Sequence, residues 1–508
     1  MRIGTSMSTK KLDQACVDEY NIPLIVMMEN AVLSALKHLD INLYDRYVVV
    51  SGVGNNGGDG IGIARQLKAR NKNVEIFIVG NMEKITQCSK TNLEIIKAMK
   101  IPYKIIHNNK DNYEVLECLK NSIQNSHIVI DCIFGTGLER EIKGTFKEVI
   151  DIINENKNLV YSIDVPSGIN ATTGEILGTC IKADKTISFE FYKRGFLKYE
   201  TKEYIGEVVV EHIGIPEDIL NKYDDKEYIT SMDFVKHKIK EKNRFSFKSD
   251  FGKVTIFAGA KGFSGASFIA SESAVKSGSG LVTLVCDEEI QNIVSTKLSE
   301  VMTANYKEEN RINKLIETSN CIGFGCGMGD NKQTLEKLQY VLNNSNCPIV
   351  IDADGLNVLK NNSSILKEYK DRIVITPHLG EMSRLTGKSI SYIRENRIDV
   401  AKKFAKDNNI IVLLKGYETI ITDGSITYVN PTGNSSMANG GMGDCLLGMI
   451  TSFIGQNMMS VFEAVVCATF IHGYIGDVLS KKLYTVNATH IINEISSTMK
   501  KFNIEINL

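Results

Sequence analysis

The stretch YVVVSGVGNNGGDG, residues 47–60, runs from a short apolar strand straight into a glycine-rich turn. A helical pattern of apolar residues follows at 61–69. A strand that enters a helix through glycines is the first unit of an α/β fold, because glycine lets the backbone turn sharply and approach a ligand. Backbone N–H groups in such a turn, with the positive end of a helix behind them, suit a phosphate.

Further strand-like segments alternate with helical patterns along the chain. The first series continues at 74–79, 127–133, 159–163, 186–189 and 207–211, and a second lies at 253–258, 281–285, 321–324, 348–351, 373–375 and 410–414. The strongest helical patterns are 441–453 and 462–479. Such alternation is typical of parallel sheets covered by helices on both faces. We therefore expect an α/β protein of two domains.

The residues between the two series place the domain boundary near residue 220. They include EDILNKYDDKEY and KHKIKEKNRFSFKSD, which are charged and poor in large apolar side chains. This composition is typical of a solvated connector, and a helix that covers one domain fits it as well. The sequence predicts a first domain at 1–218, a linker region at 219–250 and a second domain at 251–508.

Length and composition exclude several classes of protein. The chain has 508 residues, 43% of them hydrophobic, which is too long for one small module and too apolar for a disordered chain. Lys and Arg number 59 against 60 Asp and Glu, so the net charge of −1 predicts neither a nucleic-acid nor a membrane partner. The 11 cysteines form no C-x-x-C pair, and the amino terminus lacks the apolar core of a signal peptide. These features predict reduced thiols and a cytoplasmic location.

The first glycine turn contains G-x-G-x-x-G, which by itself favours an NAD-dependent dehydrogenase. The second strand, VEIFIVGN, ends without the acidic residue that such enzymes use to hold the ribose. A Gly-Lys-Ser/Thr sequence is also missing from the turn, so it is not a Walker loop. A tight turn with no ligand is the structural alternative.

Two later strand ends carry carboxylates, Asp131 in IDCIFGTG and Asp164 in IDVPSG. Because the carboxyl ends of parallel strands meet at one edge of a sheet, we expect Asn56, Asp131, Asp164 and Ser167 to converge. Their amide, carboxylate and hydroxyl oxygens suit a hard cation and lack the nitrogen and sulfur ligands of a zinc site. A single Asp at a strand end is as often a loop cap, whereas two on successive strands favour a site.

The motifs GNNGGDG, DCIFGTG and DVPSGINATTG together resemble the NAD(P)HX epimerase domain of the bifunctional NAD(P)H-hydrate repair enzymes. The resemblance covers about residues 1–215 and implies a Rossmann-like three-layer sandwich that interconverts the R and S epimers of hydrated NADH and NADPH. It implies that Asn56, Asp131 and Ser167 hold a potassium ion. Asp164 would contact the substrate and act as the acid-base group, which suits inversion of a carbon that carries a hydroxyl beside a ring nitrogen.

The same motifs imply further substrate contacts, which are Asn55, Asn56, Gly57, Gly58, Asp59, Gly135, Thr136, Gly137, Leu138, Glu139, Arg140 and Glu141. One stretch departs from the family pattern. TISFEFYKRGFLKY is bulkier and more aromatic than the usual run, and Lys193 fills the lysine position in it.

The strongest motif of the second half is NGGMGD, residues 439–444, followed by the apolar run CLLGMITSFIG. Consecutive small residues at a helix amino terminus expose N–H groups that suit a transferring phosphoryl group, and Asp444 lies where a base would meet a hydroxyl. Other strand ends carry KGFSGAS, GCGMG, DADGLN, TPHLGEM and LKG. Lys415 suits a nucleotide phosphate and His378 a substrate, although each alone is as well explained by a surface or structural role.

Together with SGSGLVTL, these motifs resemble the ribokinase-like NAD(P)H-hydrate dehydratase over about residues 230–500. The resemblance implies a second three-layer sandwich that uses ADP, or ATP in some members, to phosphorylate the hydrate hydroxyl before phosphate leaves. Contacts to the hydrate would come from Ala266, Gly327, His378 and Asp444, with Asp444 as the base. The nucleotide would be held by Lys415, Gly416, Gly441 and Gly443. The chain has GCGMG and HLGE where the family usually has GPGLG and HPGE.

The leading hypothesis is therefore an epimerase fused to an ADP-dependent dehydratase, with K⁺, Mg²⁺ and a nucleotide as cofactors and co-substrate. Its partners would be small molecules only, and we expect a homo-oligomer. One alternative is a nucleotide-binding domain fused to a hydroxymethylpyrimidine or sugar kinase. Another treats the first domain as a noncatalytic scaffold.

Overall fold

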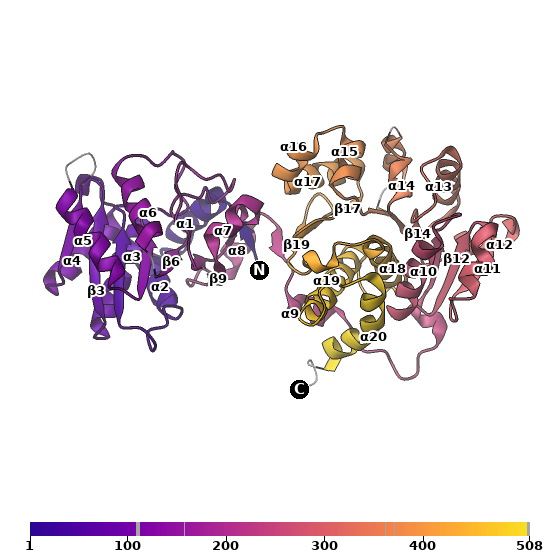
Figure 1. Cartoon of the computed structure of the whole chain (residues 1–508), viewed down its shortest axis with the longest axis horizontal. Helices are drawn as coiled ribbons and strands as arrows, with labels where there is room; N and C mark the ends of the chain where they lie inside the picture. Colours follow the sequence, from indigo (N-terminus) through magenta and orange to yellow (C-terminus); the bar gives the residue numbers. More distant parts are fainter. Residues whose placement is uncertain (108–111, 157, 361, 370, 505–508) are drawn as a thin grey trace. The chain divides into compact units, whose positions relative to one another are not determined.

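The computed structural model describes residues 1–107, 112–156, 158–360, 362–369 and 371–504. Contacts divide the chain into two compact units, Met1–Glu227 and Tyr228–Leu508. In Figure 1 the first unit is coloured indigo to magenta and most of the second pink to yellow. Each unit is built on its own mainly parallel sheet.

In the described residues, the first unit has a seven-stranded parallel sheet in the order β4-β3-β2-β5-β6-β7-β9. Its strands are β2 (Arg46–Ser51), β3 (Asn73–Val79), β4 (Tyr103–Ile106), β5 (Ile128–Cys132), β6 (Leu159–Ile163), β7 (Lys185–Phe189) and β9 (Glu207–Glu211). A separate parallel pair joins β1 (Ile3–Gly4) to β8 (Tyr192–Lys193). The sequence predicted the strands of the large sheet except β4, which is short and only partly buried.

Helices cover both faces of this sheet. They are α1 (Ser6–Tyr20), α2 (Leu24–Leu36), α3 (Asn55–Ala69), α4 (Gln87–Ala98), α5 (Tyr113–Gln124), α6 (Thr145–Asn156), α7 (Lys202–Ile205) and α8 (Glu217–Lys222), with 3₁₀ turns η1 (Met82–Lys84), η2 (Arg194–Leu197) and η3 (Tyr199–Thr201). Along β2, Val49 packs in one core with Ile63 of α3, while Val48 and Val50 pack in another with Val149 of α6. Side chains of a strand alternate between faces, so two cores make this unit a three-layer sandwich.

The sheet of the second unit has ten strands within the described residues, in the order β10-β19-β18-β17-β16-β15-β14-β11-β12-β13. They are β10 (Glu227–Ile229), β11 (Lys253–Phe257), β12 (Leu281–Cys286), β13 (Met302–Asn305), β14 (Cys321–Phe324), β15 (Ile349–Ile351), β16 (Ile373–Ile375), β17 (Ile411–Leu414), β18 (Thr419–Thr422) and β19 (Thr427–Asn430). In the order of the sheet, every neighbouring pair between β13 and β17 is parallel. Strand β18 is antiparallel to both β17 and β19. The sequence did not predict β10, β13, β18 or β19.

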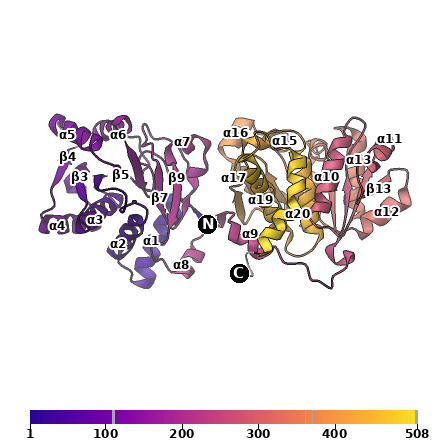
Figure 2. The same ribbon diagram turned by 60° about the horizontal axis from the view of Figure 1, so that its bottom comes forward.

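The helices of the second unit are α9 (Met232–Lys238), α10 (Ser264–Lys276), α11 (Glu288–Ser295), α12 (Glu309–Thr318), α13 (Lys332–Asn344), α14 (Asp354–Asn357), α15 (Leu379–Thr386), α16 (Ile390–Glu395), α17 (Arg397–Asn408), α18 (Met442–Gly455), α19 (Val461–Ser480) and α20 (Ala488–Ile504). The 3₁₀ turns are η4 (Lys248–Phe251), η5 (Ser363–Glu368) and η6 (Ser435–Met437). Helices α10, α18, α19 and α20 pack against one another (Figure 1), and Figure 2 shows α20 beside α10. The segment predicted as a linker contains the end of α8 together with β10, α9 and η4.

Helix α19 is long and apolar enough to cross a membrane by length and composition alone. In the structure, however, 67% of its apolar window is buried, and it lies in the main core of the second unit. Burial against α18 and α20 explains the apolar sequence without a membrane.

Both sheets reverse their strand order at one point, and this point locates the ligand edge. In the first sheet the reversal lies between β2 and β5, and in the second between β11 and β14. In open α/β sheets the loops after such strands diverge to opposite sides, so a ligand crevice is expected at the carboxyl edge of each reversal. The motifs at Asn56 and Gly135 follow the first pair of strands, and those at Ala266 and Gly327 follow the second.

The contact between α10 and α18 depends on a residue without a side chain. A Cβ added to Gly448 of α18 would lie 2.0 Å from the Ala270 carbonyl oxygen and 2.1 Å from Ser273 Oγ. We predict that Gly448→Ala lowers the free energy of unfolding of the second unit by about 1–3 kcal/mol, because the helices must move apart. Chemical denaturation measures the loss. Gly265→Ala is the control, since a Cβ there meets no heavy atom within 4 Å, and equal stability of the two variants would contradict the prediction.

Candidate functional site

The first site begins where β2 enters α3. Helix α3 starts at Asn55, so the predicted glycine turn is shorter than expected, and Gly57, Gly58 and Gly60 are helical. A Cβ on Gly57 would lie 1.9 Å from the Gly52 carbonyl oxygen, and one on Gly60 would lie 2.4 Å from Ser51 Oγ. These glycines therefore let the helix approach its own strand, and only residues 52–54 form the turn.

The predicted cation ligands lie in one hydrogen-bond network around Phe134. Asn56 Nδ2 donates to the Phe134 carbonyl oxygen at 3.0 Å, and the Phe134 amide donates to Ser167 Oγ at 2.9 Å. Ser167 Oγ donates to Asp131 Oδ1 at 2.6 Å, and Ser162 Oγ donates to Asp131 Oδ2 at 2.8 Å. Burial raises the pKa of Asp131, and these donors oppose that rise.

Asn56 supplies an oxygen that suits a cation. Its Oδ1 atom is buried and has no hydrogen-bond partner among the described residues. A buried carbonyl oxygen without a partner is costly unless an ion or a water completes the site. The residues present therefore fit a potassium ion at this carboxyl edge.

Asp164 is the best-positioned carboxylate of this site. Its Oδ1 atom lies 2.8 Å from Nζ of Lys193, which is completely buried, and its Oδ2 atom accepts from the Thr136 amide at 3.2 Å. Asp164 has a left-handed φ of 66°, a conformation that most residues avoid and that Asp tolerates better than most. A Cβ on Gly135 would lie 3.1 Å from Asp164 Oδ2 and 3.2 Å from Asn56 Cβ. The three motifs therefore meet at Gly135.

Two further acids lie near Asp164, in α1 and α3. Burial, followed by the charge of Asp164, raises the pKa of Asp13 to about 6. The same causes raise the pKa of Asp59 well above its usual value. The sequence identified Asp59 through its motif, whereas Asp13 lies in an ordinary helical pattern and was missed.

The segment 135–141 is mixed in exposure. Leu138 is buried in the core beneath α6, so its side chain does not face the crevice, whereas Glu139, Arg140 and Glu141 are exposed. A Cβ on Gly137 would meet no heavy atom within 4 Å. Gly137 and the exposed residues are therefore open to a ligand.

The second site is centred on the amino terminus of α18. Gly441 precedes the helix with a left-handed φ of 91°, and Asp444 lies in the first turn. A Cβ on Gly443 would lie 3.3 Å from Asp352 Oδ2 and 3.5 Å from Lys415 Nζ. The glycines therefore bring helix N–H groups close to a charged pair.

That pair joins the ends of β15 and β17. Lys415 Nζ lies 2.6 Å from Asp352 Oδ1, and the Asp352 side chain is 2% exposed. Burial lowers the pKa of Lys415, but the neighbouring charges of Asp352 and Glu381 outweigh it and leave the pKa raised. The sequence proposed Lys415 for a phosphate and assigned no role to Asp352.

Asp444 has both acidic and basic side chains as neighbours. Burial raises its pKa, a hydrogen bond with the Cys326 thiol opposes that rise, and the charge of Asp352 adds to it. The charge of Lys415 opposes it, whereas that of Asp354 adds to it. A carboxylate whose pKa is raised accepts a proton more readily, which suits a general base.

His378 caps α15. Its Nδ1 atom accepts from the Gly380 amide at 2.9 Å and from the Glu381 amide at 3.3 Å, while the Glu381 carboxylate accepts from the His378 amide at 2.8 Å. Burial, then the charge of Lys415, lowers the pKa of His378. Because Nδ1 accepts from two amides, the ring proton lies on Nε2, which is 3.6 Å from Glu381 Oε1, so a ligand at Nε2 would compete with that carboxylate.

Ala266 and Gly327 are neighbours across the point where the strand order reverses. A Cβ on Gly327 would lie 3.2 Å from Ala266 Cβ, and Gly327 has a left-handed φ of 63°. The same Cβ would lie only 2.8 Å from Phe263 Cβ, so glycine at 327 lets this loop pack closely against the start of α10.

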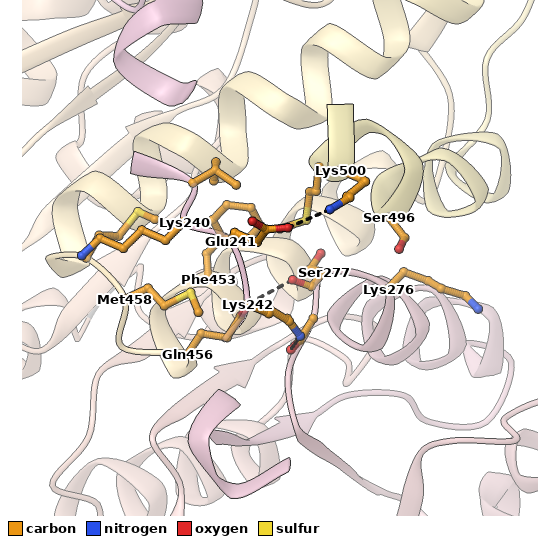
Figure 3. Close-up of a pocket in the computed structure, with 14 residues that line it drawn as sticks. Lys240, Glu241, Lys242, Lys276, Ser277, Phe453, Gln456, Met458, Ser496 and Lys500 are labelled. Atoms are coloured by element: carbon orange, nitrogen blue, oxygen red, sulfur yellow. Dashed lines mark hydrogen bonds and ion pairs between the residues drawn. The ribbon is translucent and has the colours of Figure 1, made fainter. Parts of the chain in front are cut away.

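A cavity of about 350 Å³ lies elsewhere in the second unit, where residues 239–242 meet the carboxyl ends of α10 and α18 and the side of α20 (Figure 3). Lys500 Nζ lies 3.0 Å from Glu241 Oε1, and Lys242 Nζ donates to the Gly278 carbonyl oxygen at 2.9 Å. Helix carboxyl ends carry partial negative charge, which these lysines balance. None of the predicted site residues lines this cavity.

Comparison with known proteins agrees with this division of the chain. The family model described as YjeF-related protein N-terminus matches residues 24–195. The model described as NAD(P)H-hydrate dehydratase matches residues 254–497. One bifunctional NAD(P)H-hydrate repair enzyme, from Thermofilum pendens, is 32% identical over 95% of this chain and 93% of its own. Another, from Moorella thermoacetica, is 31% identical over 94% and 92%.

The chain belongs to the family of bifunctional NAD(P)H-hydrate repair enzymes. The family predicted from the motifs is confirmed. A ribokinase-like superfamily protein of Enterococcus faecalis covers 55% of this chain and 96% of its own, with a TM-score of 0.51 and 26% identity. A hypothetical protein of Streptococcus mutans covers 54% and 99%, with a TM-score of 0.50 and 28% identity. The predicted ribokinase-like fold of the second half is thereby confirmed.

Glu381 generates a pH-dependence of stability. Burial, against the opposing charge of Lys415, raises the pKa of Glu381 from 4.5 to about 7. Because the folded state then holds this proton more tightly than the unfolded state, stability falls as pH rises from about 4.5 to 7 and is lowest above it. We predict that Glu381→Gln removes up to about 3 kcal/mol of the difference between pH 5 and pH 8 in the free energy of unfolding of the second unit.

Urea unfolding at these pH values measures this difference. Glu336→Gln, in which the replaced side chain is 59% exposed, serves as the matched control. The same dependence on pH in Glu381→Gln and in the unsubstituted chain would contradict the assignment.

Proposed function

We propose that this chain repairs hydrated NADH and NADPH. The first unit would epimerise the R and S hydrates, and the second would dehydrate the S hydrate at the expense of ADP, giving AMP and phosphate. The observation that carries the proposal is that each unit gathers its family motifs at the point where its strand order reverses. The matching regions of the two family models lie within the proposed domains 1–218 and 251–508. Of the predicted connector 219–250, the residues from Tyr228 onward belong to the second unit, because β10 pairs in its sheet and Val235 packs in its core.

In the first unit, Asp164 is the proposed acid-base group. The hydrate carbon bears both a hydroxyl and the ring nitrogen, so removal of the hydroxyl proton lets a carbonyl form while the carbon–nitrogen bond breaks, its electron pair passes to the nitrogen, and the nitrogen takes up a proton. Closure on the opposite face remakes that bond and returns the proton to oxygen. Asp164 suits both transfers because Lys193 and the Thr136 amide hold its two oxygens.

Potassium belongs to the same proposal. Within the part of the chain that the structure describes, Asn56 Oδ1 is buried without a hydrogen-bond partner, and Asp131 and Ser167 lie in the same network through Phe134. A bound potassium ion would supply fixed positive charge beside the phosphates of the substrate. Substrate contacts are proposed along 55–59 and 135–141, with Leu138 contributing only backbone.

In the second unit, Asp444 is the proposed base. It would take the proton of the hydrate hydroxyl as that oxygen attacks the terminal phosphorus of ADP, which breaks the bond to AMP. The carbon–oxygen bond would then break, and its electron pair would leave on the phosphate. Loss of a proton from the adjacent carbon would restore the dihydronicotinamide. Lys415, Gly416, Gly441 and Gly443 would hold the nucleotide, while Ala266, Gly327 and His378 would hold the hydrate.

The cation of the nucleotide is proposed to be Mg²⁺. Among the described residues there is no group of three or more His, Cys, Asp or Glu side chains that could hold a metal ion. This agrees with magnesium carried largely by phosphate oxygens and water. ADP is the proposed donor, and ATP is its alternative.

A homo-oligomer and a cytoplasmic location complete the proposal. Tyr20, Leu24, Val26 and Leu33 of α1 and α2 are exposed, and such apolar patches favour a second copy of the chain. All 11 cysteines are free, which suits a reducing compartment.

The function is tested by recovery of NADH absorbance from NADH hydrate, with ADP and ATP in separate reactions. The repair reaction regenerates NADH and, with ADP, releases AMP and phosphate in equal amounts. A small-molecule kinase would instead leave a stable phosphorylated product. No recovery with either nucleotide would overturn the proposal.

We expect separate substitutions to slow epimer exchange in the first unit and dehydration in the second. We predict that Asp164→Asn slows exchange between the hydrate epimers at least about 100-fold, because acid-base groups contribute about 10²–10⁴, and leaves dehydration of the S epimer unchanged. Asp444→Asn should do the reverse. Chiral chromatography follows exchange and absorbance follows dehydration, so each variant is the control for the other. Exchange that persists in Asp164→Asn would make Asp164 structural, and dehydration that persists in Asp444→Asn would remove it from the base role.

Potassium should act on the first unit alone. Replacing K⁺ by tetramethylammonium should slow epimer exchange and lower the melting temperature of the first unit, because a bound ion stabilises the folded state. Dehydration of the S epimer should not change. Asn56→Ala should remove the effect of K⁺ on melting, and a K⁺ effect of the same size in that variant would move the ion elsewhere.

A further inference from the structure

The turn between β17 and β18 contains Lys415 and Gly416, which are proposed to hold the nucleotide. This turn is unusual in its backbone, since Gly416 has a φ of 151° and Glu418 a left-handed φ of 54°. Its entry is held by the Lys415 amide, which donates to the Pro377 carbonyl oxygen at 2.8 Å. A non-glycine residue in the left-handed region needs surrounding contacts to stay there.

Arg397, the first residue of α17, supplies such contacts. Its Nη1 atom donates to the Tyr417 carbonyl oxygen at 2.6 Å, and its Nη2 atom donates to the Glu418 carbonyl oxygen at 2.9 Å. A Cβ on Gly416 would lie 3.2 Å from Arg397 Nη2. The guanidinium therefore contacts two successive residues of the turn, and a side chain at Gly416 would push against it.

The position of Arg397 in its helix makes a purely local role unfavourable. Helix amino termini carry partial positive charge, so a cation in the first turn of α17 is destabilising there. Burial also disfavours the charged guanidinium. The two hydrogen bonds from the guanidinium to the turn offset the unfavourable helix position and the burial. A planar guanidinium can donate both bonds at once because its N–H groups form a fixed fork.

We propose that Arg397 is a positioning residue for nucleotide binding, which holds the turn 416–418 in the conformation that presents Lys415 and Gly416 to ADP. The proposal rests on the proposed nucleotide role of this turn. Because Arg397 acts on the co-substrate's binding turn and not on the base Asp444, its loss weakens ADP binding more than it slows turnover.

The test uses Arg397→Lys, which keeps the charge and loses the fork, and Arg397→Gln, which loses both. In the full-length protein, calorimetric titration with Mg·ADP should give a Kd about tenfold higher in each variant, whereas kcat at saturating ADP stays within about threefold. Hydrogen exchange at the amides of 416–418 should become faster without nucleotide. That readout does not depend on activity.

Two other substitutions sharpen the comparison. Thr419 Oγ1 donates to the Gly416 carbonyl oxygen at 2.9 Å, so Thr419→Val should show the same pattern with a smaller change. Arg372 Nη1 donates to the Ser345 carbonyl oxygen, before β16 and so at the opposite edge of the sheet. Arg372→Gln therefore removes a similar contact and should leave the Kd for ADP unchanged.

The outcomes separate this inference from the proposed function. If the unsubstituted chain binds ADP and both Arg397 variants bind it within twofold of that affinity, the role of Arg397 is overturned and the nucleotide site stands. A loss of kcat with unchanged Kd would also overturn it. If Arg372→Gln weakens ADP binding equally, the effect is general destabilisation. If the unsubstituted chain binds neither ADP nor ATP, both proposals fall.

Discussion

In each unit an aspartate that follows a strand is buried against a lysine from another part of the same carboxyl edge. Asp164 pairs with Lys193 in the first unit, and Asp352 pairs with Lys415 in the second. Removing either partner would leave an unpaired charge out of water, which is strongly destabilising. The surrounding structure depends on these pairs because they fix where the crevice can hold charge. Asp131 lies in the same unit as the Asp164–Lys193 pair, and Asp444 lies in the same unit as the Asp352–Lys415 pair.

The two units differ in the kind of ligand that their carboxyl edges suit. In the first, the buried amide oxygen of Asn56, which has no hydrogen-bond partner among the described residues, is the basis of the proposed cation site. In the second, the amino terminus of α18 presents N–H groups beside Lys415, which points to phosphate. In the first unit Gly57 lets α3 approach the backbone of Gly52, and in the second Gly443 places the start of α18 beside the side chains of Asp352 and Lys415. The neutral net charge of the chain agrees with anions that are bound by a few local groups.

Much of the fold could be predicted because its strands are short, apolar and separated by clear helical patterns. The strands that were not predicted, such as β4 and β18, are short edge or hairpin elements whose pairing depends on tertiary neighbours. The glycine turn after β2 was predicted too long, because glycines 57, 58 and 60 suggest a loop locally, whereas in the fold they let α3 pack closely against the strands and helices around it. Asp13 and Arg397 escaped prediction for a related reason. Each lies in an ordinary helical pattern, and only the fold brings it to a site.

The sequence by itself determined that the chain is a two-domain α/β protein, which family it belongs to, and which strand ends carry the family motifs. It could do so because motifs at strand ends are local, and the parallel arrangement sends every such end to one edge. The tertiary structure alone decided which charges are paired, which carboxylates have raised pKa values, and which distant guanidinium holds the Lys415 turn. These properties depend on burial and on distances between residues far apart in the chain, and a linear pattern contains neither.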